Sequence, residues 1–423
     1  MREADAGAPA APARSTEAGA GASATARNAG IDLLRGIAIV LVVFNHLGIR
    51  IPLKRTLLAD VFPARLLSDL NYNGYEAVLV FFVISGFLIA GNALRRWGGL
   101  ARIDLRTFYA LRCSRIVPCL LLLVAILSAL HLLGVPDYVI DRPGQSLPRA
   151  VFAALALHLN WYEGMTGYLP GNWDVLWSLS IEEVFYLAFP VACLLTRRTW
   201  VLLPLLVLLA ASMPWTHAAL RGNEIWQEKA YLPGMSAIAI GVIGALLVRR
   251  QPALSALQAH GLIVVGALGI GAEMFGGRSL RPLLGEGILL LLTVSAMLLL
   301  VGLQARPVAR LRGFGWLASW GRLSYEIYLS HMFVVYAVVR IYRASGGDVR
   351  WGFLWYALAL PICWLLGAGV ARWVSLPCER ALRARMLKTV PPRDPAGAYS
   401  GVPASGVSQP RLGRGGRKLP EGG

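Results

Sequence analysis

Charged side chains are scarce in this sequence. Only 15% of the 423 residues are Asp, Glu, Lys or Arg, whereas 56% are hydrophobic. Soluble domains average about 25% charged residues. A water-soluble fold could not cover so much apolar surface with so few charges, so that class is excluded for most of the chain. The mean hydropathy of +0.57 points the same way.

Cysteine is also sparse, and its pattern excludes two further classes. The five cysteines are odd in number, scattered, and mostly in or beside apolar runs. They indicate neither a disulfide framework nor a zinc site, and we expect them to be buried as small hydrophobic residues. No set of His, Asp, Glu and Cys has the spacing of metal ligands, so no metal site is predicted.

The two ends of the sequence lack large apolar residues. The first 30 residues have no apolar core of a cleavable signal peptide, and they are rich in Ala, Gly, Ser and Thr. Residues 389–423 are rich in Pro, Gly and Arg. Because such segments cannot bury enough apolar surface to fold, we expect disordered tails at 1–30 and 389–423 around a membrane domain at 31–388.

The net charge of +18 does not indicate a nucleic-acid-binding protein. Such a protein would carry its basic residues as a stripe on a soluble domain. Here they lie at the ends of apolar runs, where the positive-inside rule places cytoplasmic Lys and Arg. The sequence therefore predicts a lipid bilayer as a partner, and no nucleic acid.

Ten apolar runs are long enough to cross a bilayer, which takes about 20 helical residues. An eleventh run, 149–160, is short, and if it crossed, the later basic loops would face outward. The positive-inside rule therefore favours ten crossings with both termini cytoplasmic. The sequence predicts an all-α, multi-pass helical bundle in the cytoplasmic (inner) cell membrane. The ten runs are 33–49, 75–94, 116–134, 176–195, 200–215, 232–248, 259–275, 283–303, 323–341 and 351–374.

The first apolar run carries Arg35 and His46. Ionisable residues within a membrane are costly and commonly mark function. The two are eleven residues apart, which places them on one face of a helix, about 16 Å apart along its axis. Arg35 also fits an interfacial arginine whose side chain snorkels. His46 ends the run beside Asn45, and this polar company favours a functional role.

In two further segments, polar residues lie within or beside an apolar run. Ser85 and Gly86 fit close helix packing, because small residues let helices approach. Arg112 and Arg115 share a helix face at i and i+3. They fit either a cytoplasmic anchor or a phosphate site, since guanidinium forks match phosphate oxygens.

Two later runs carry carboxylates and a second histidine. Glu182 and Glu183 point about 100° apart on a helix, and a solvated helix start is the alternative explanation. Ser324 and His331 share a face, and Tyr328 adjoins His331. The alternative to a functional role is a structural histidine whose hydrogen bonds are all made within the fold. The remaining histidines lack such polar company and are expected to be structural: His131, His158, His217 and His260.

Five of these segments, in this order, resemble the acyltransferase 3 family of membrane acyltransferases. The resemblance covers about residues 30–385. The sequence departs from the family pattern at Leu79, where members often carry an acidic or polar residue; Glu76 lies one turn earlier. The matching motifs are Arg35-Gly36…His46 and the segments 81–88, 112–118, 177–186 and 324–331.

The resemblance implies an O-acyltransferase. Its donor would be acyl-CoA, chiefly acetyl-CoA, as a co-substrate rather than a permanently bound cofactor. Its acceptor would be a hydroxyl of a carbohydrate or glycolipid, such as a cell-surface or exported polysaccharide. The alternative is a proton-coupled transporter or flippase of a glycolipid or small molecule, which would use the same buried His and Glu as a proton relay.

A mechanistic hypothesis follows for the family's motifs. His46 is the predicted base, because imidazole titrates near neutral pH, and Glu182 would orient it as a carboxylate does in a triad. With CoA bound inside and His46 near the outer leaflet, the acyl group would be delivered across the membrane. The predicted site residues are His46, Glu182 and His331 (catalytic), Arg35, Arg112 and Arg115 (co-substrate), and Ser85, Tyr325 and Tyr328 (substrate).

Overall fold

The computed structural model describes residues 27–250, 254–307 and 313–387. Over these residues it is helical and contains no strand, which confirms the predicted all-α class. Nine helices in this part of the chain are long and apolar enough to cross a membrane. They run over Ala29–Gly48, Gly74–Trp97, Leu105–Leu132, Gly171–Thr196, Thr199–Ala218, Glu224–Arg250, Ala256–Leu284, Gly287–Ala305 and Phe353–Leu387.

Several of these spans are built from consecutive helices. A short helix precedes or follows the main one where a turn or a proline interrupts the pattern. The long helices are α1 (Ala29–Gly48), α3 (Gly74–Trp97), α4 (Leu105–Leu132), α8 (Leu176–Thr196), α9 (Thr199–Ala211), α12 (Tyr231–Arg250), α13 (Ala256–Leu284), α14 (Gly287–Ala305), α16 (Ser324–Ala344), α17 (Phe353–Val370) and α18 (Leu376–Leu387). The short ones are α2 (Ala64–Tyr72), α5 (Leu147–Leu155), α6 (Leu159–Thr166), α7 (Gly171–Asp174), α10 (Met213–Ala218), α11 (Glu224–Lys229) and α15 (Gly315–Arg322).

The predicted run 323–341 forms α16, a helix of 21 residues. It is long enough to cross a bilayer, but its polar residues lower its hydropathy, so it is not among the nine. The short run 149–160 does not form a span. It is divided between α5 and α6, of nine and eight residues, and Leu157 between them adopts a left-handed conformation with φ of 60°.

Helix α1 begins at Ala29, inside the segment predicted to be a disordered tail. The side chain of Asn28 accepts a hydrogen bond from the Gly30 amide at 3.0 Å, which caps the helix start. The domain therefore begins before residue 31. The rest of both predicted tails, 1–26 and 389–423, lies outside the described residues, as does Lys388.

Glycines let the central helices touch at the backbone. A Cβ added to Gly86 on α3 would lie 1.9 Å from the Ile238 carbonyl oxygen on α12. Reciprocally, a Cβ on Gly241 of α12 would lie 2.0 Å from the Val83 oxygen. Small residues at such crossings are the usual basis of close packing in membranes. Gly86 thus packs as expected, and the crossing fixes the position of its neighbour Ser85.

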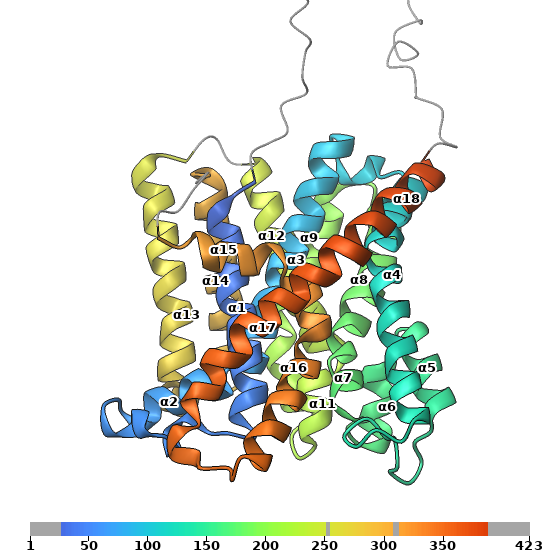
Figure 1. Cartoon of the computed structure of the whole chain (residues 1–423). Coiled ribbons are helices and arrows are strands. Elements are labelled where there is room, and N and C mark those ends of the chain that lie inside the picture. Colours follow the sequence, from blue (N-terminus) through green and yellow to red (C-terminus); the bar gives the residue numbers. More distant parts are fainter. Residues whose placement is uncertain (1–26, 251–253, 308–312, 388–423) are drawn as a thin grey trace, which may run out of the picture.

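The start of α1 and the end of α18 lie on the same face of the bundle, at the top of Figure 1. The short helices α2, α5 and α6 lie at the opposite face. The last span is a continuous helix in which a π-helical turn, η5 (Ala371–Ser375), joins α17 to α18. There Ser375 Oγ donates to Glu326 Oε1 at 2.7 Å, tying the turn to α16.

Candidate active site

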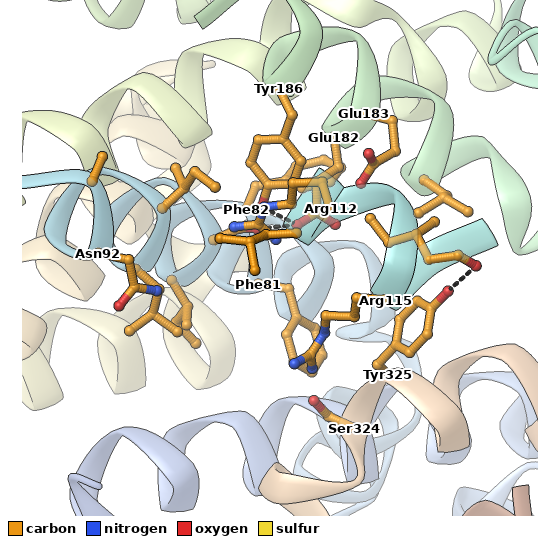
Figure 2. A pocket seen from close by; sticks show the side chains of 18 of the residues that line it. Phe81, Phe82, Asn92, Arg112, Arg115, Glu182, Glu183, Tyr186, Ser324 and Tyr325 are labelled. Atoms are coloured by element: carbon orange, nitrogen blue, oxygen red, sulfur yellow. Dashed lines mark hydrogen bonds between the residues drawn. The ribbon is translucent and has the colours of Figure 1, made fainter. Parts of the chain in front are cut away.

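A cavity of about 650 Å³ is lined by residues of α1, α3, α4, α8, α16 and α18. Its walls come from short stretches of each helix, and Figure 2 shows the polar side chains that meet in it. Seven of the nine predicted site residues line it: Arg35, Ser85, Arg112, Arg115, Glu182, Tyr325 and Tyr328. His46 and His331 are not among its lining residues.

Arginine is the dominant charge of the cavity. Arg112 lies over the ring of Tyr186, with 4.3 Å between its guanidinium carbon and the ring centroid, and Arg115 lies over Tyr325 at 5.9 Å. These stacked arginines face the cavity in Figure 2. Six arginines line the cavity, and the motifs did not indicate three of them: Arg95, Arg96 and Arg383.

Ser85, Glu182 and Tyr186 form a hydrogen-bonded group on the cavity wall. Tyr186 donates to Glu182 Oε1 at 2.5 Å, and the Ser85 hydroxyl contacts both partners. Ser85 therefore has a polar role beside the packing of Gly86. The hypothesis had expected Glu182 to orient His46. The structure instead pairs Glu182 with these two hydroxyls. The neighbouring Glu183 also lines the cavity, and its buried Oε1 has no hydrogen-bond partner among the described residues.

His46 and His331 form a ring pair beyond the cavity, with centroids 5.1 Å apart. Nδ1 of His331 lies 2.8 Å from the Tyr328 carbonyl oxygen and 3.2 Å from that of Ile327. Carbonyls only accept, so Nδ1 carries the hydrogen, and Nε2 of the neutral ring keeps a lone pair. That Nε2 is buried and has no partner in the described part of the chain. His331 is thus only half satisfied as a structural histidine.

The faces predicted from spacing meet across α1 and α16. A guanidinium NH2 of Arg35 donates to Ser324 Oγ at 2.7 Å, and His46 lies against His331. Arg35 and His46 of α1 therefore face α16, and Ser324 and His331 of α16 face α1. Arg35 is held by a buried hydroxyl at the cavity, which a purely snorkelling arginine would not be.

Tyr328 connects the cavity to the histidine pair. It lines the cavity, and its ring centroid lies 5.9 Å from that of His331. Its hydroxyl lies 2.7 Å from Ser178 Oγ on α8. The side chain therefore forms the inner end of the cavity, with the histidines directly behind it.

A buried ion group that the sequence did not reveal lies among the short helices. Lys229 Nζ donates to Glu163 Oε2 at 2.7 Å and also contacts Asp174. Lys229 is 1% exposed and Glu163 is fully buried. Burial, together with the neighbouring Asp174 carboxylate, raises the pKa of Glu163 well above its ordinary value, against the pull of Lys229. The group joins α6, α7 and α11.

His217 has polar partners that the sequence did not suggest. Its Nδ1 lies 2.8 Å from Glu286 Oε2, and Arg221 lies 2.9 Å from the other oxygen. Although burial opposes the shift, the hydrogen bonds from Arg221 and His217 lower the pKa of Glu286 below its ordinary value. This group joins α10 to the start of α14. Across residues 27–250, 254–307 and 313–387, no group of three His, Cys, Asp or Glu could hold a metal ion.

Comparison with known proteins agrees with this geometry. A family model described as an acyltransferase domain matches residues 28–370. O-acetyltransferase OatA of Staphylococcus aureus (strain NCTC 8325 / PS 47) is 30% identical over an alignment of 172 residues, and the match covers 38% of this chain and 24% of that protein. The protein of the same name in strain MRSA252 matches with the same identity and shares.

The match spans about a quarter of the length of these curated relatives. No solved structure matches the chain at a significant level. The family match is broader, since it extends from the start of α1 to the end of α17. The chain therefore belongs to the acyltransferase 3 family and is a membrane acyltransferase.

Proposed function

We propose that this chain is an O-acyltransferase that moves an acyl group from acyl-CoA to a hydroxyl of a carbohydrate-containing acceptor, such as a cell-surface or exported polysaccharide. The observation that carries the proposal is the arginine-lined cavity that ends at Tyr328, with His331 and His46 behind it. Guanidinium forks suit the phosphates of CoA. The name O-acetyltransferase of the relatives favours acetyl as the group transferred.

The proposal includes an orientation in the cytoplasmic (inner) cell membrane. With α16 added to the nine apolar spans, the chain crosses ten times, and an even number agrees with two described ends on one face (Figure 1). We place that face in the cytoplasm by the positive-inside rule. The loops that return to it carry Arg95, Arg96, Arg197, Arg198, Arg249, Arg250 and Arg306.

In this orientation, donor and acceptor approach from opposite sides. CoA enters the cavity from the cytoplasm, and Arg112, Arg115 and Arg35 hold its phosphates and the start of its pantetheine arm. The acyl thioester then lies at the inner end, beside Tyr328. His46 is only half-buried, so an acceptor hydroxyl from the outer side can reach it. The acyl group must pass the Tyr328 side chain to meet that hydroxyl.

The reaction is a base-assisted acyl transfer. The acceptor oxygen forms a bond to the thioester carbonyl carbon, while His46 takes the hydroxyl proton. The carbonyl electron pair moves to its oxygen, where the Tyr328 hydroxyl donates a hydrogen bond to the oxyanion. On collapse the C–S bond breaks, and His46 returns the proton to sulfur, releasing CoA. His331 positions the His46 ring, and Glu182 positions Ser85 and Tyr186 on the donor side.

The test is mass spectrometry of surface glycans and secreted metabolites from cells with the wild-type chain, with His46→Ala, or without a functional copy. We expect an acetylated species that is present only with the wild type. A second assay follows labelled acetyl-CoA added to membranes from the same cells. Movement of a glycolipid or small molecule without covalent change, unaffected by acetyl-CoA, would support a transporter and overturn the proposal.

A further inference from the structure

The last helix brings to the cavity an arginine that lies outside the family match. The match ends at residue 370, whereas α18 runs over Leu376–Leu387. Arg383 on this helix nevertheless lines the same cavity as Arg112 and Arg115. The C-terminal helix therefore contributes to the wall of the site.

The guanidinium of Arg383 is held by one ion pair, but one of its hydrogen-bond donors is unused. Its terminal NH2 forms an ion pair with Glu379, one turn earlier on the same helix. The side chain of Glu379 is 12% exposed and that of Arg383 is 42% exposed. Nε of Arg383 is buried and has no hydrogen-bond partner among the described residues. A buried N–H without a partner costs free energy, and a ligand in the cavity would offset that cost.

The position of α18 is fixed by contacts at its start. The η5 turn is tied to α16 by the Ser375–Glu326 hydrogen bond, and α18 then packs along α4. Arg383 lies four residues before the described end of α18, and that end lies at the same face as the start of α1 (Figure 1). It is thus at the mouth of the cavity, whereas Tyr328 forms the inner end.

The charge of the cavity indicates the ligand. Six arginines and two glutamates line it, so the lining is strongly suited to an anion with several charges. A guanidinium at the mouth, with an unused Nε–H beside its terminal NH2 groups, matches a phosphate group, which accepts hydrogen bonds on several oxygens. CoA carries its phosphates at the nucleotide end, which is the end that remains nearest the mouth when the thioester lies inside.

We infer that Arg383 binds a phosphate at the nucleotide end of the CoA donor, so that α18 completes the donor site. The inference rests on the proposed function, because it takes CoA as the donor. Arg383 is a binding residue in this assignment and takes no part in the acyl transfer itself.

The test is CoA binding by the full chain purified in a maltoside detergent, which supplies no phosphate of its own. Labelled CoA is compared with pantetheine, which has the same thiol arm without phosphates. We expect Arg383→Ala to weaken CoA binding roughly 10-fold, the usual effect of a hydrogen bond to a charged group, and to leave pantetheine binding unchanged. Arg383→Lys, which keeps the charge but loses the fork, should lie between.

Arg380→Ala is the matched control, because Arg380 is exposed on the same helix, one turn earlier, and does not line the cavity. It should bind CoA like the wild type. Thermal unfolding of each variant shows whether α18 remains folded. The inference fails if Arg383→Ala is folded and binds CoA as the wild type does, while Arg112→Ala/Arg115→Ala loses binding. If the wild type itself does not bind CoA, the proposed function fails as well.

Discussion

The imidazole rings of His46 and His331 lie 5.1 Å apart, inclined at 44°, on two helices far apart in the sequence. The two are not equivalent. His331 is fully buried and fixed through Nδ1 by backbone carbonyls of its own helix. His46 is half-buried, and in the proposed mechanism its ring is the one that meets the acceptor. The pair therefore combines a fixed ring with an accessible one.

This difference predicts the effect of a substitution at His46. His46→Ala should lower acetyl transfer by about 10²–10⁴-fold, the usual contribution of a general base. CoA binding should be unchanged, because His46 does not line the cavity. Transfer rates and CoA binding are measured on the same purified samples. Wild-type transfer by the His46→Ala variant would remove the base assignment.

Arg112 and Arg115 should determine affinity for the donor. The double variant Arg112→Ala/Arg115→Ala is expected to weaken CoA binding by about 100-fold, since each lost hydrogen bond to a charged group costs about 1.5–3 kcal/mol. Raising the salt concentration should weaken wild-type binding more than binding by the double variant. Equal binding by both proteins, measured with labelled CoA, would show that these arginines serve only as cytoplasmic anchors.

Tyr328 and Ser178 share one hydrogen bond, which makes them a matched pair for testing the oxyanion role. Ser178→Ala removes the bond but keeps the Tyr328 hydroxyl, whereas Tyr328→Phe removes the hydroxyl. We expect Tyr328→Phe to lower kcat about 100-fold, as loss of an oxyanion donor does, with KM for acetyl-CoA little changed. Ser178→Ala should keep most of the activity. If both variants lose activity equally, the hydroxyl serves to hold the side chain in place.

The glycine crossing of α3 and α12 predicts a strong effect on stability. Gly86→Ala places a methyl group against the Ile238 carbonyl oxygen, so the helices must separate, at a cost of about 1–3 kcal/mol or more. Gly91→Ala on the same helix meets only the end of the Arg95 side chain at 3.6 Å, and should be neutral. Thermal unfolding in detergent compares the two. A stable Gly86→Ala variant would contradict the backbone contact.

The buried Lys229 predicts a pH-dependent loss of stability. Lys229→Met leaves the carboxylates of Glu163 and Asp174 together, at a cost of about 3–5 kcal/mol. The pKa of Glu163 is already raised in the folded chain, and loss of the lysine raises it further. A raised carboxyl pKa means that folding is favoured while the group is protonated. Stability should therefore fall as the pH rises above the ordinary Glu pKa.

The control for this experiment is Glu163→Gln, which keeps Lys229 paired with Asp174 and removes the group that titrates. It should lose less stability than Lys229→Met, and its unfolding temperature should change little with pH. Unfolding of Lys229→Met that is independent of pH would show that the carboxylates are solvated, against the burial in the structure.

Helical periodicity predicted much of the site, because it determines which residues share a face. Arg35 and His46 face α16 as expected, and Arg112 and Arg115 both reach the cavity. Nearly every long helix also follows from the apolar runs. These include α16, the predicted run 323–341, although Glu326, His331 and Arg340 lower its hydropathy.

Periodicity could not identify partners between helices. Glu182 was expected to meet His46, but a single helix shows only the direction of a side chain, and that direction leads to Ser85. The Lys229–Glu163 pair joins two residues that lie outside the predicted apolar runs, so no periodic pattern indicated it. In the sequence, Arg383 is one of several basic residues after the last predicted apolar run, 351–374, and only the packing of α18 on α4 turns it toward the cavity.

The π-helical turn η5 has a consequence for comparing this chain with its relatives. A π-helical turn holds an extra residue compared with an α-helical one, so the length of Ala371–Ser375 sets the rotation of everything after it. Deleting one residue there would rotate α18 by roughly 100° and turn Arg383 away without substituting it. In relatives with a shorter turn, the residue that occupies this place would bear a different alignment number. Beyond residue 370, insertions and deletions therefore matter as much as substitutions.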